Sequence, residues 1–253
     1  MQAVAPPIVR SSAASRELLL RTLHSLSGVF PVAVFLILHL VVNARGIAGE
    51  AAFERTASAV RRLPLWFAIE LLGIVLPLTF HAAYGVKLAF DRSRATPGRY
   101  VRDGAYLAQR VSGLVTLAFI AYHLSDLWAA KLLGRVEPQA FYGLLASRLS
   151  TTVKGVPLIA LLYLVGVSAA TFHMTNGLCA VARTLGFVTS QRGRRALLAF
   201  LVLLGGGVWL LGASTTIYFA TGVRWTALAP GGSAPWCSVV DRDDSRSPPT
   251  PTR

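Results

Sequence analysis

The chain has 253 residues, of which 54% are hydrophobic and only 14% are charged. This composition is too apolar for an ordinary soluble domain of the same length and favours a membrane protein. In a soluble protein, the net charge of +14 would raise the question of nucleic acid. Here the basic residues lie between apolar segments, so we expect membrane lipid headgroups, and no nucleic acid, as their counter-charge.

Charged residues divide the sequence into five apolar windows, each long enough for a helix that crosses a hydrocarbon core of about 30 Å. The alternating pattern of membrane strands is missing, so helices are expected. We therefore predict an all-α membrane protein with five transmembrane helices, at about residues 22–44, 63–86, 111–130, 155–182 and 196–223. The first window follows three arginines but is too long for the apolar part of a signal peptide, so we expect a retained helix.

The helices are expected to form one domain over residues 1–225, joined by loops such as "DRSRATPGRY" and "GRVEPQAFYG". Residues 226–253 are rich in Pro, Ser and Asp and are expected to be a disordered tail. Lys and Arg are divided almost evenly between the two membrane sides, but the arginine-rich connection 87–110 favours a cytoplasmic N-terminus. Cys179 and Cys237 lack metal-type spacing, and we expect them to form no disulfide and to bind no metal.

The second and fourth predicted helices share the motif T-F-H-x-x-x-G, which places His81 and His173 four residues before Gly85 and Gly177. A residue four positions along a helix lies on the same face, one turn away. These glycines are therefore expected to leave room for a flat cofactor bound by the histidines. The alternative is that small residues simply let two helices approach closely.

The first and third predicted helices share a Ser-Gly pair followed, 11 and 10 residues after the glycine, by His39 and His123. Because successive helices cross in opposite directions, this pair should lie near one membrane face and the His81–His173 pair near the other, roughly a dozen Å apart along the membrane normal. Two imidazoles that converge at one depth are the axial ligands of a bis-histidine haem, and helix bundles commonly hold such cofactors. We predict that the first four helices form a bundle with two haem sites.

The histidines have two other interpretations. A single histidine in a spanning helix usually makes an interhelical hydrogen bond, but one on each of four consecutive helices favours a bound group. Zinc is also bound by histidine, but its sites bring about four ligands to one point, and no carboxylate or cysteine completes either pair. Haem iron therefore fits the pattern better than zinc.

The same residues resemble a known family: the single-chain, five-helix, two-haem cytochrome b subunits that anchor succinate dehydrogenases and fumarate reductases to the membrane. The resemblance runs through nearly all of the first four helices, in "RTLHSLSGVFPVAVFLILHLVVN", "LPLWFAIELLGIVLPLTFHAAYG", "QRVSGLVTLAFIAYHLSD" and "YLVGVSAATFHMTNGL". It implies that His81 and His173 ligate the proximal haem b, near the cytoplasmic partner subunits, and that His39 and His123 ligate the distal haem b.

The resemblance also implies a function and partners. A flavoprotein subunit oxidises succinate, an iron–sulfur subunit on the cytoplasmic face passes the electrons on, and the two haems deliver them to a quinone, with menaquinone favoured, in the bacterial cytoplasmic (inner) membrane. This chain would supply only the part of the complex that passes electrons to quinone, because its sequence has no nucleotide-binding fingerprint and no cluster-binding cysteines. Some fumarate reductases of this type carry a glutamate two residues before the fourth ligand, whereas this chain has Thr171. We therefore expect succinate oxidation.

Glu70 precedes His81 by 11 residues, close to three turns of an α-helix, and is expected on the same helix face at the level of the distal pair. Quinone reduction takes up protons as well as electrons, so a buried carboxylate there could supply or relay them. The alternative is a carboxyl group that only hydrogen-bonds neighbouring helices. Asp126, three residues after His123, is expected to be solvated at the interface, with proton entry as the alternative.

Four residues at the other membrane face could hold the proximal haem propionates by charge-assisted hydrogen bonds: Ser25, Ser27, Arg110 and Arg183. His24 lies outside both histidine pairs and could touch a propionate or the iron–sulfur partner, or be a solvated interfacial histidine.

Two alternative functions remain open from the sequence. One is a di-haem cytochrome b of another quinone-linked dehydrogenase, such as a fumarate reductase, hydrogenase or formate dehydrogenase. The other is a transporter whose histidines relay protons.

Overall fold

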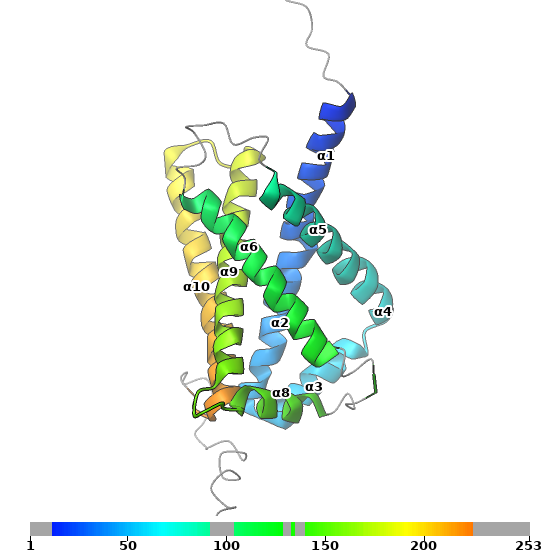
Figure 1. Cartoon of the computed structure of the whole chain (residues 1–253). Helices are drawn as coiled ribbons and strands as arrows, with labels where there is room; N and C mark the ends of the chain where they lie inside the picture. The colour runs from blue at the N-terminus through cyan, green and yellow to red at the C-terminus, as the bar shows by residue number, and fades with distance from the viewer. Residues whose placement is uncertain (1–11, 92–103, 129–132, 135–139, 225–253) are drawn as a thin grey trace, which may run out of the picture.

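The computed structural model describes residues 12–91, 104–128, 133–134 and 140–224 (Figure 1). Within these residues the chain is helical apart from its turns and one isolated bridge between Val153 and Val156. The prediction of an all-α membrane protein is confirmed by five segments long and apolar enough to cross a membrane: Ser15–Ala48, Trp66–Phe90, Gly104–Leu127, Leu158–Thr184 and Gln191–Thr221. The predicted tail, residues 226–253, lies outside the described residues.

The first spanning segment is longer than predicted and is kinked. It comprises α1 (Ser12–Ser27), a π-helical turn η1 (Gly28–Ala33), α2 (Val34–Ala44) and a 3₁₀ turn η2 (Arg45–Ala48). Phe30 leaves the helical region, with φ −142° and ψ 119°, immediately before Pro31. Proline lacks an N–H and disfavours the helical conformation in the residue before it, which accounts for the kink.

The second spanning segment also departs from a regular α-helix. It comprises α4 (Trp66–Ala68), a π-helix η3 (Ile69–Val75) and α5 (Leu76–Phe90). A π-helix closes its hydrogen bonds over one more residue than an α-helix and therefore turns through a smaller angle per residue. Side-chain directions before η3 are thus shifted relative to those in α5.

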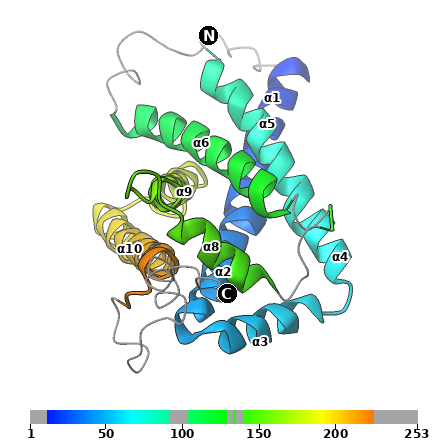
Figure 2. The ribbon, with the colours of Figure 1, turned by 60° about the horizontal axis from the view of Figure 1, so that its bottom comes forward.

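The remaining spans are α6 (Gly104–His123) with the π-helical end η4 (Leu124–Trp128), α9 (Leu158–Thr184) and α10 (Gln191–Thr221). The helix α10 begins where the Ser190 hydroxyl accepts a hydrogen bond from the Gly193 N–H, and it ends at Gly222, whose φ is +73°. The helix α9 packs against both α6 and α10, while α10 also packs against α2, and α1 packs against α5 (Figures 1 and 2).

Two short helices, α3 (Glu50–Arg61) and α8 (Phe141–Ser150), lie at the same end of the bundle (Figures 1 and 2). Loops were expected between the spans, and for "GRVEPQAFYG" this prediction is wrong at its end, because α8 begins at Phe141. The helix forms because its apolar residues Tyr142, Leu145, Ala146 and Leu149 recur at helical spacing and are all buried.

The main buried cluster joins these short helices to the spans. Phe53 of α3 and the buried face of α8 pack with Tyr163 of α9 and with Tyr218 and Phe219 of α10. Burial and the neighbouring Tyr218 hydroxyl raise the pKa of Tyr142, so its phenol stays neutral. The cluster closes this end of the bundle with apolar and aromatic side chains.

Candidate functional site

The structure brings the four helix histidines together as two pairs. The ring centroids of His81 and His173 lie 6.1 Å apart, and those of His39 and His123 lie 5.8 Å apart. The rings of each pair are nearly perpendicular, and both separations are short enough for two imidazoles to bind one ion between them.

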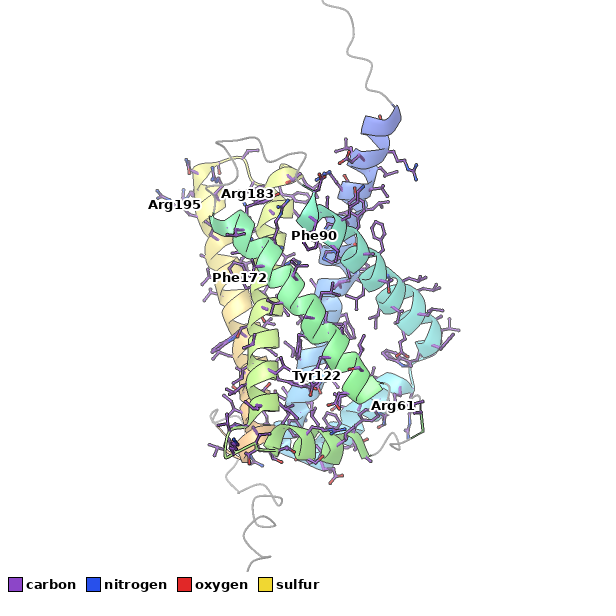
Figure 3. All side chains as sticks on the ribbon, viewed as in Figure 1. Arg61, Phe90, Tyr122, Phe172, Arg183 and Arg195 are labelled. Carbon is purple, nitrogen blue, oxygen red and sulfur yellow. The ribbon has the colours of Figure 1, made fainter. Side chains whose placement is uncertain are left out.

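The two pairs lie at different levels of the bundle. Figure 3 labels Phe172, the neighbour of His173, in the half where α9 ends, and Tyr122, the neighbour of His123, at the end covered by α3 and α8. All four rings are half-buried. We call the His81–His173 pair the proximal site and the His39–His123 pair the distal site.

In the proximal site, the Nδ1 atoms of both rings face backbone carbonyls. Nδ1 of His81 lies 2.9 Å from the carbonyl oxygen of His24, and Nδ1 of His173 lies 3.1 Å from that of Gln109. A carbonyl oxygen can only accept, so Nδ1 carries the proton in both rings. The lone pair is therefore on Nε2, the nitrogen left to bind a metal.

A serine hydroxyl lies next to each of these carbonyls. The hydroxyl of Ser27 lies 3.5 Å from Nδ1 of His81, and the hydroxyl of Ser112 lies 3.4 Å from Nδ1 of His173. Each serine donates its own hydrogen bond to the same carbonyl that the histidine uses. The two halves of the proximal site are thus built in the same way, on α1 and on α6.

Glycines let these rings approach the facing helix. A Cβ on Gly28 would collide with the His81 ring, and one on Gly113 would lie 2.8 Å from Cε1 of His173. The sequence pointed to both Ser-Gly pairs as a repeat, but Ser27 was assigned only to a haem propionate, Ser112 had no assigned role, and Gln109 was missed. The signal was present, because His24 and Gln109 each stand three residues before the serine of their pair.

Gly85 and Gly177 face the same positions from the other side. A Cβ on Gly85 would lie 3.1 Å from Cε1 of His24, and one on Gly177 would lie 3.3 Å from Nε2 of Gln109. The motif T-F-H-x-x-x-G therefore packs its glycine against the residue whose carbonyl faces its histidine. That these glycines also make room for a macrocycle stays a prediction.

His24 lies in contact with the proximal site. Its ring stacks on that of His81, with centroids 4.2 Å apart and planes 11° apart. Its Nδ1 atom is buried without a hydrogen-bond partner among the described residues. A buried nitrogen of this kind indicates a polar group that the protein chain itself does not supply.

The remaining residues predicted around the proximal haem are placed differently from one another. Arg110 donates to the carbonyls of Leu88 and Asp91 at the end of α5, at 3.0 and 3.4 Å. Arg183 is exposed and donates to the carbonyl of Cys179 at 3.4 Å. Ser25 is half-buried. Of the four predicted residues, only Ser27 contacts a histidine of the pair.

The distal site uses side chains where the proximal site uses the backbone. Nδ1 of His123 lies 3.2 Å from the hydroxyl of Tyr163, and the amide nitrogen of Asn43 lies 3.4 Å from Nε2 of His39. Phe35 and Phe119 stand beside the two rings, at centroid distances of 5.3 and 5.8 Å. The aromatic cluster under α8 continues directly from Tyr163.

Asp126 is not solvated as expected. Its side chain is only 14% exposed and pairs with Arg148 of α8 at 3.2 Å, while its other carboxylate oxygen is buried without a partner among the described residues. This ion pair was not foreseen, because Arg148 lies on α8, a helix that was not predicted from the sequence.

Glu70 lies in the π-helix η3 and is half-buried. In the described part of the chain it makes no hydrogen bond or ion pair. The expectation that it shares a face with His81 assumed α-helical spacing, which η3 interrupts. Its part in proton handling stays a prediction.

The donor set suits haem iron. Two imidazoles face each other in each site, and no group of three or more His, Cys, Asp or Glu side chains in the described ranges could hold a metal ion. The proximal rings are held through Nδ1, which leaves Nε2 for iron, and the buried Nδ1 of His24 lies beside them. The residues present therefore fit axial ligation of haem.

Comparison with known proteins gives two matches. Residues 10–93, which include His39 and His81, match the family described as "Succinate dehydrogenase/Fumarate reductase transmembrane subunit". The chain is also similar to the succinate dehydrogenase cytochrome b558 subunit of Bacillus subtilis (strain 168), with 37% identity over 182 residues that cover 72% of this chain and 86% of the relative. No solved structure matches it.

Proposed function

This chain belongs to the family of succinate dehydrogenase/fumarate reductase transmembrane subunits and serves as a membrane-anchor cytochrome b subunit of succinate dehydrogenase, and we propose that it carries electrons to quinone through two b haems. When bound, haem b supplies a one-electron carrier at each level of the bundle. The chain's own residues bind these groups, set their depth and keep water away from them.

The observation that carries the proposal is the Nδ1 hydrogen bond of each proximal histidine to a backbone carbonyl. Such a bond holds the ring plane, selects the Nδ1–H tautomer and raises the basicity of Nε2. His81 and His173 are proposed as the axial ligands of the proximal haem b on this ground. Ser27 and Ser112 support the same tautomer from the side.

His39 and His123 are proposed as the axial ligands of the distal haem b. Tyr163 orients His123 through Nδ1, and Asn43 donates to the backbone carbonyl of His39 at 2.8 Å. The helices α3 and α8 and their aromatic cluster cover this site. We infer that they exclude water from the end of the electron path.

The role of the family implies partner subunits and a membrane location for this chain. We propose that flavoprotein and iron–sulfur subunits of succinate dehydrogenase dock on the cytoplasmic face and that the chain crosses the bacterial inner membrane with its N-terminus in the cytoplasm. The arginines between α9 and α10, on the same membrane side as the start of α1, support this orientation. Menaquinone is the proposed quinone, from the resemblance found in the sequence.

Glu70 is proposed to handle protons for the quinone near the distal haem. It has no partner in the described part of the chain, so its carboxyl group is available for exchange. A positioned carboxylate that gives or takes protons speeds a reaction by about 10²- to 10⁴-fold.

The test is to purify the intact complex and count its haems. We expect two b haems per chain in the absorption spectrum, both reduced by succinate. A preparation with one haem or none per chain would reject the two-haem arrangement. If succinate failed to reduce either haem in a complex with all subunits, the electron path would be rejected.

A further inference from the structure

A groove opens between α9 and α10 in the half of the bundle that holds the proximal site. It has a volume of roughly 280 Å³, and its walls include Phe172 and Cys179 of α9 and Leu198, Val202 and Gly205 of α10. Three of these side chains face outward, since Phe172 is 44% exposed, Leu198 52% and Val202 71%. Because this apolar groove lies on the outer side of two spanning helices, an apolar chain from the surrounding lipid can fill it.

Arginines stand directly above the groove on both helices. Arg183 follows Cys179 by four residues on α9, and Arg194 and Arg195 precede Leu198 by four and three residues on α10. Residues three or four apart share a helix face, so all three arginines belong to the faces that line the groove. Figure 3 labels Arg183 and Arg195 at this end of the two helices.

These arginines carry no counter-charge within the described ranges. All three are exposed. Arg194 and Arg195 make no side-chain hydrogen bond or ion pair there, and Arg183 donates only to the carbonyl of Cys179. Three guanidinium groups on two helix ends, beside the groove and at the expected headgroup level, form a site for an anion attached to an apolar chain.

The charge and the groove together select the occupant. Guanidinium groups recognise phosphate oxygens by paired hydrogen bonds, whereas a quinone is neutral and would leave the arginines unpaired. A second copy of this chain would bring three more arginines against these three. A basic pocket between spanning helices on the cytoplasmic side is typical of anionic lipid recognition.

We propose that Arg183, Arg194 and Arg195 bind the phosphate of an anionic phospholipid whose acyl chain fills the groove between α9 and α10. The lipid headgroup contacts the exposed guanidinium groups, and the acyl chain lies along Leu198 and Val202 toward Gly205. The lipid would thus cover the outer seam of α9 and α10 beside the proximal site.

The experiment uses the intact complex in a neutral detergent. Phosphatidylglycerol and phosphatidylcholine of equal chain length are titrated in, and bound lipid is counted by native mass spectrometry. We expect tighter retention of phosphatidylglycerol. Because each basic residue near a membrane surface contributes about five-fold, the triple variant R183Q/R194Q/R195Q should lose on the order of a hundred-fold in affinity.

Matched controls separate charge from position. The triple variant R45Q/R55Q/R62Q removes the same charge from exposed arginines at the other end of the bundle and should keep the preference. For the groove, Val202→Trp should weaken retention, whereas Leu203→Trp, at a neighbouring side chain that is 75% exposed and does not line the groove, should not.

Three results would overturn the proposal. Equal retention of the two lipids would remove the anionic site, and unchanged binding in Val202→Trp would remove the acyl groove. If R183Q/R194Q/R195Q kept phosphatidylglycerol but lost the soluble subunits, these arginines would instead be a protein-docking surface. None of these readouts depends on haem content or succinate oxidation.

Discussion

The proximal and distal sites hold the same kind of histidine pair by different means. Both proximal rings donate to backbone carbonyls, of His24 and Gln109. The distal ring of His123 instead depends on the hydroxyl of Tyr163. A backbone acceptor survives most substitutions, whereas a side-chain partner is lost with a single one. The proximal site should therefore tolerate changes in its supporting side chains better than the distal site does.

The largest expected effect is the loss of one haem when a ligand is removed. His81→Ala and His173→Ala should each abolish the same haem, and His39→Ala and His123→Ala should each abolish the other, because one imidazole is missing from each pair. Low-temperature absorption and electron paramagnetic resonance spectra distinguish the two haems. If His81→Ala and His173→Ala removed different haems, the pairing would be wrong.

Glu70→Gln should lower quinone turnover by at least about ten-fold, because an amide cannot exchange protons as a carboxyl group does. Both haem spectra should stay unchanged, which separates this effect from loss of the distal site. The measurement is succinate-driven quinone reduction in the purified complex. Normal turnover would return Glu70 to a structural role.

Gly113→Ala should strain the proximal site, because the added Cβ would lie 2.8 Å from Cε1 of His173. Overpacking of this kind costs about 1–3 kcal/mol, and we expect a lower thermal midpoint for proximal haem loss. Gly206→Ala is the matched control, since no atom lies within 4 Å of its added Cβ. Equal midpoints in the two variants would contradict the close approach of ring and helix.

Tyr163→Phe tests the side-chain support of the distal site. It removes the partner of Nδ1 of His123, a hydrogen bond with a net contribution of about 1 kcal/mol. The distal haem signal should shift in electron paramagnetic resonance while the proximal signal does not move. A shift of both signals, or of neither, would mean that Tyr163 does not orient His123.

Ser112→Ala should have the smallest effect. The carbonyl of Gln109 still accepts from Nδ1 of His173 when the hydroxyl is gone, so the proximal signal should move less than the distal signal does in Tyr163→Phe. The same spectra measure both variants. A larger shift in Ser112→Ala would reverse the comparison between the two sites.

Local patterns in the sequence predict much of the fold. Apolar runs of sufficient length predict spanning helices from composition alone, and the described residues contain five of them. The kink at Pro31 and the helix α8 were not foreseen. The kink has a local cause, since Pro31 stands within the first predicted span, whereas α8 depends on burial of Tyr142 and Leu149 against distant helices.

For the site, the sequence by itself determined which helices carry histidines and, through alternating helix direction, which two should share a depth. The tertiary structure decided what holds the proximal rings, because the Nδ1 partners come from residues 57 and 64 positions away in the chain. It also placed Glu70 in η3, which turns through a smaller angle per residue than the α-helix that the spacing assumed. Periodicity reports which face of a helix a residue occupies, whereas the partner on that face is set by packing between helices.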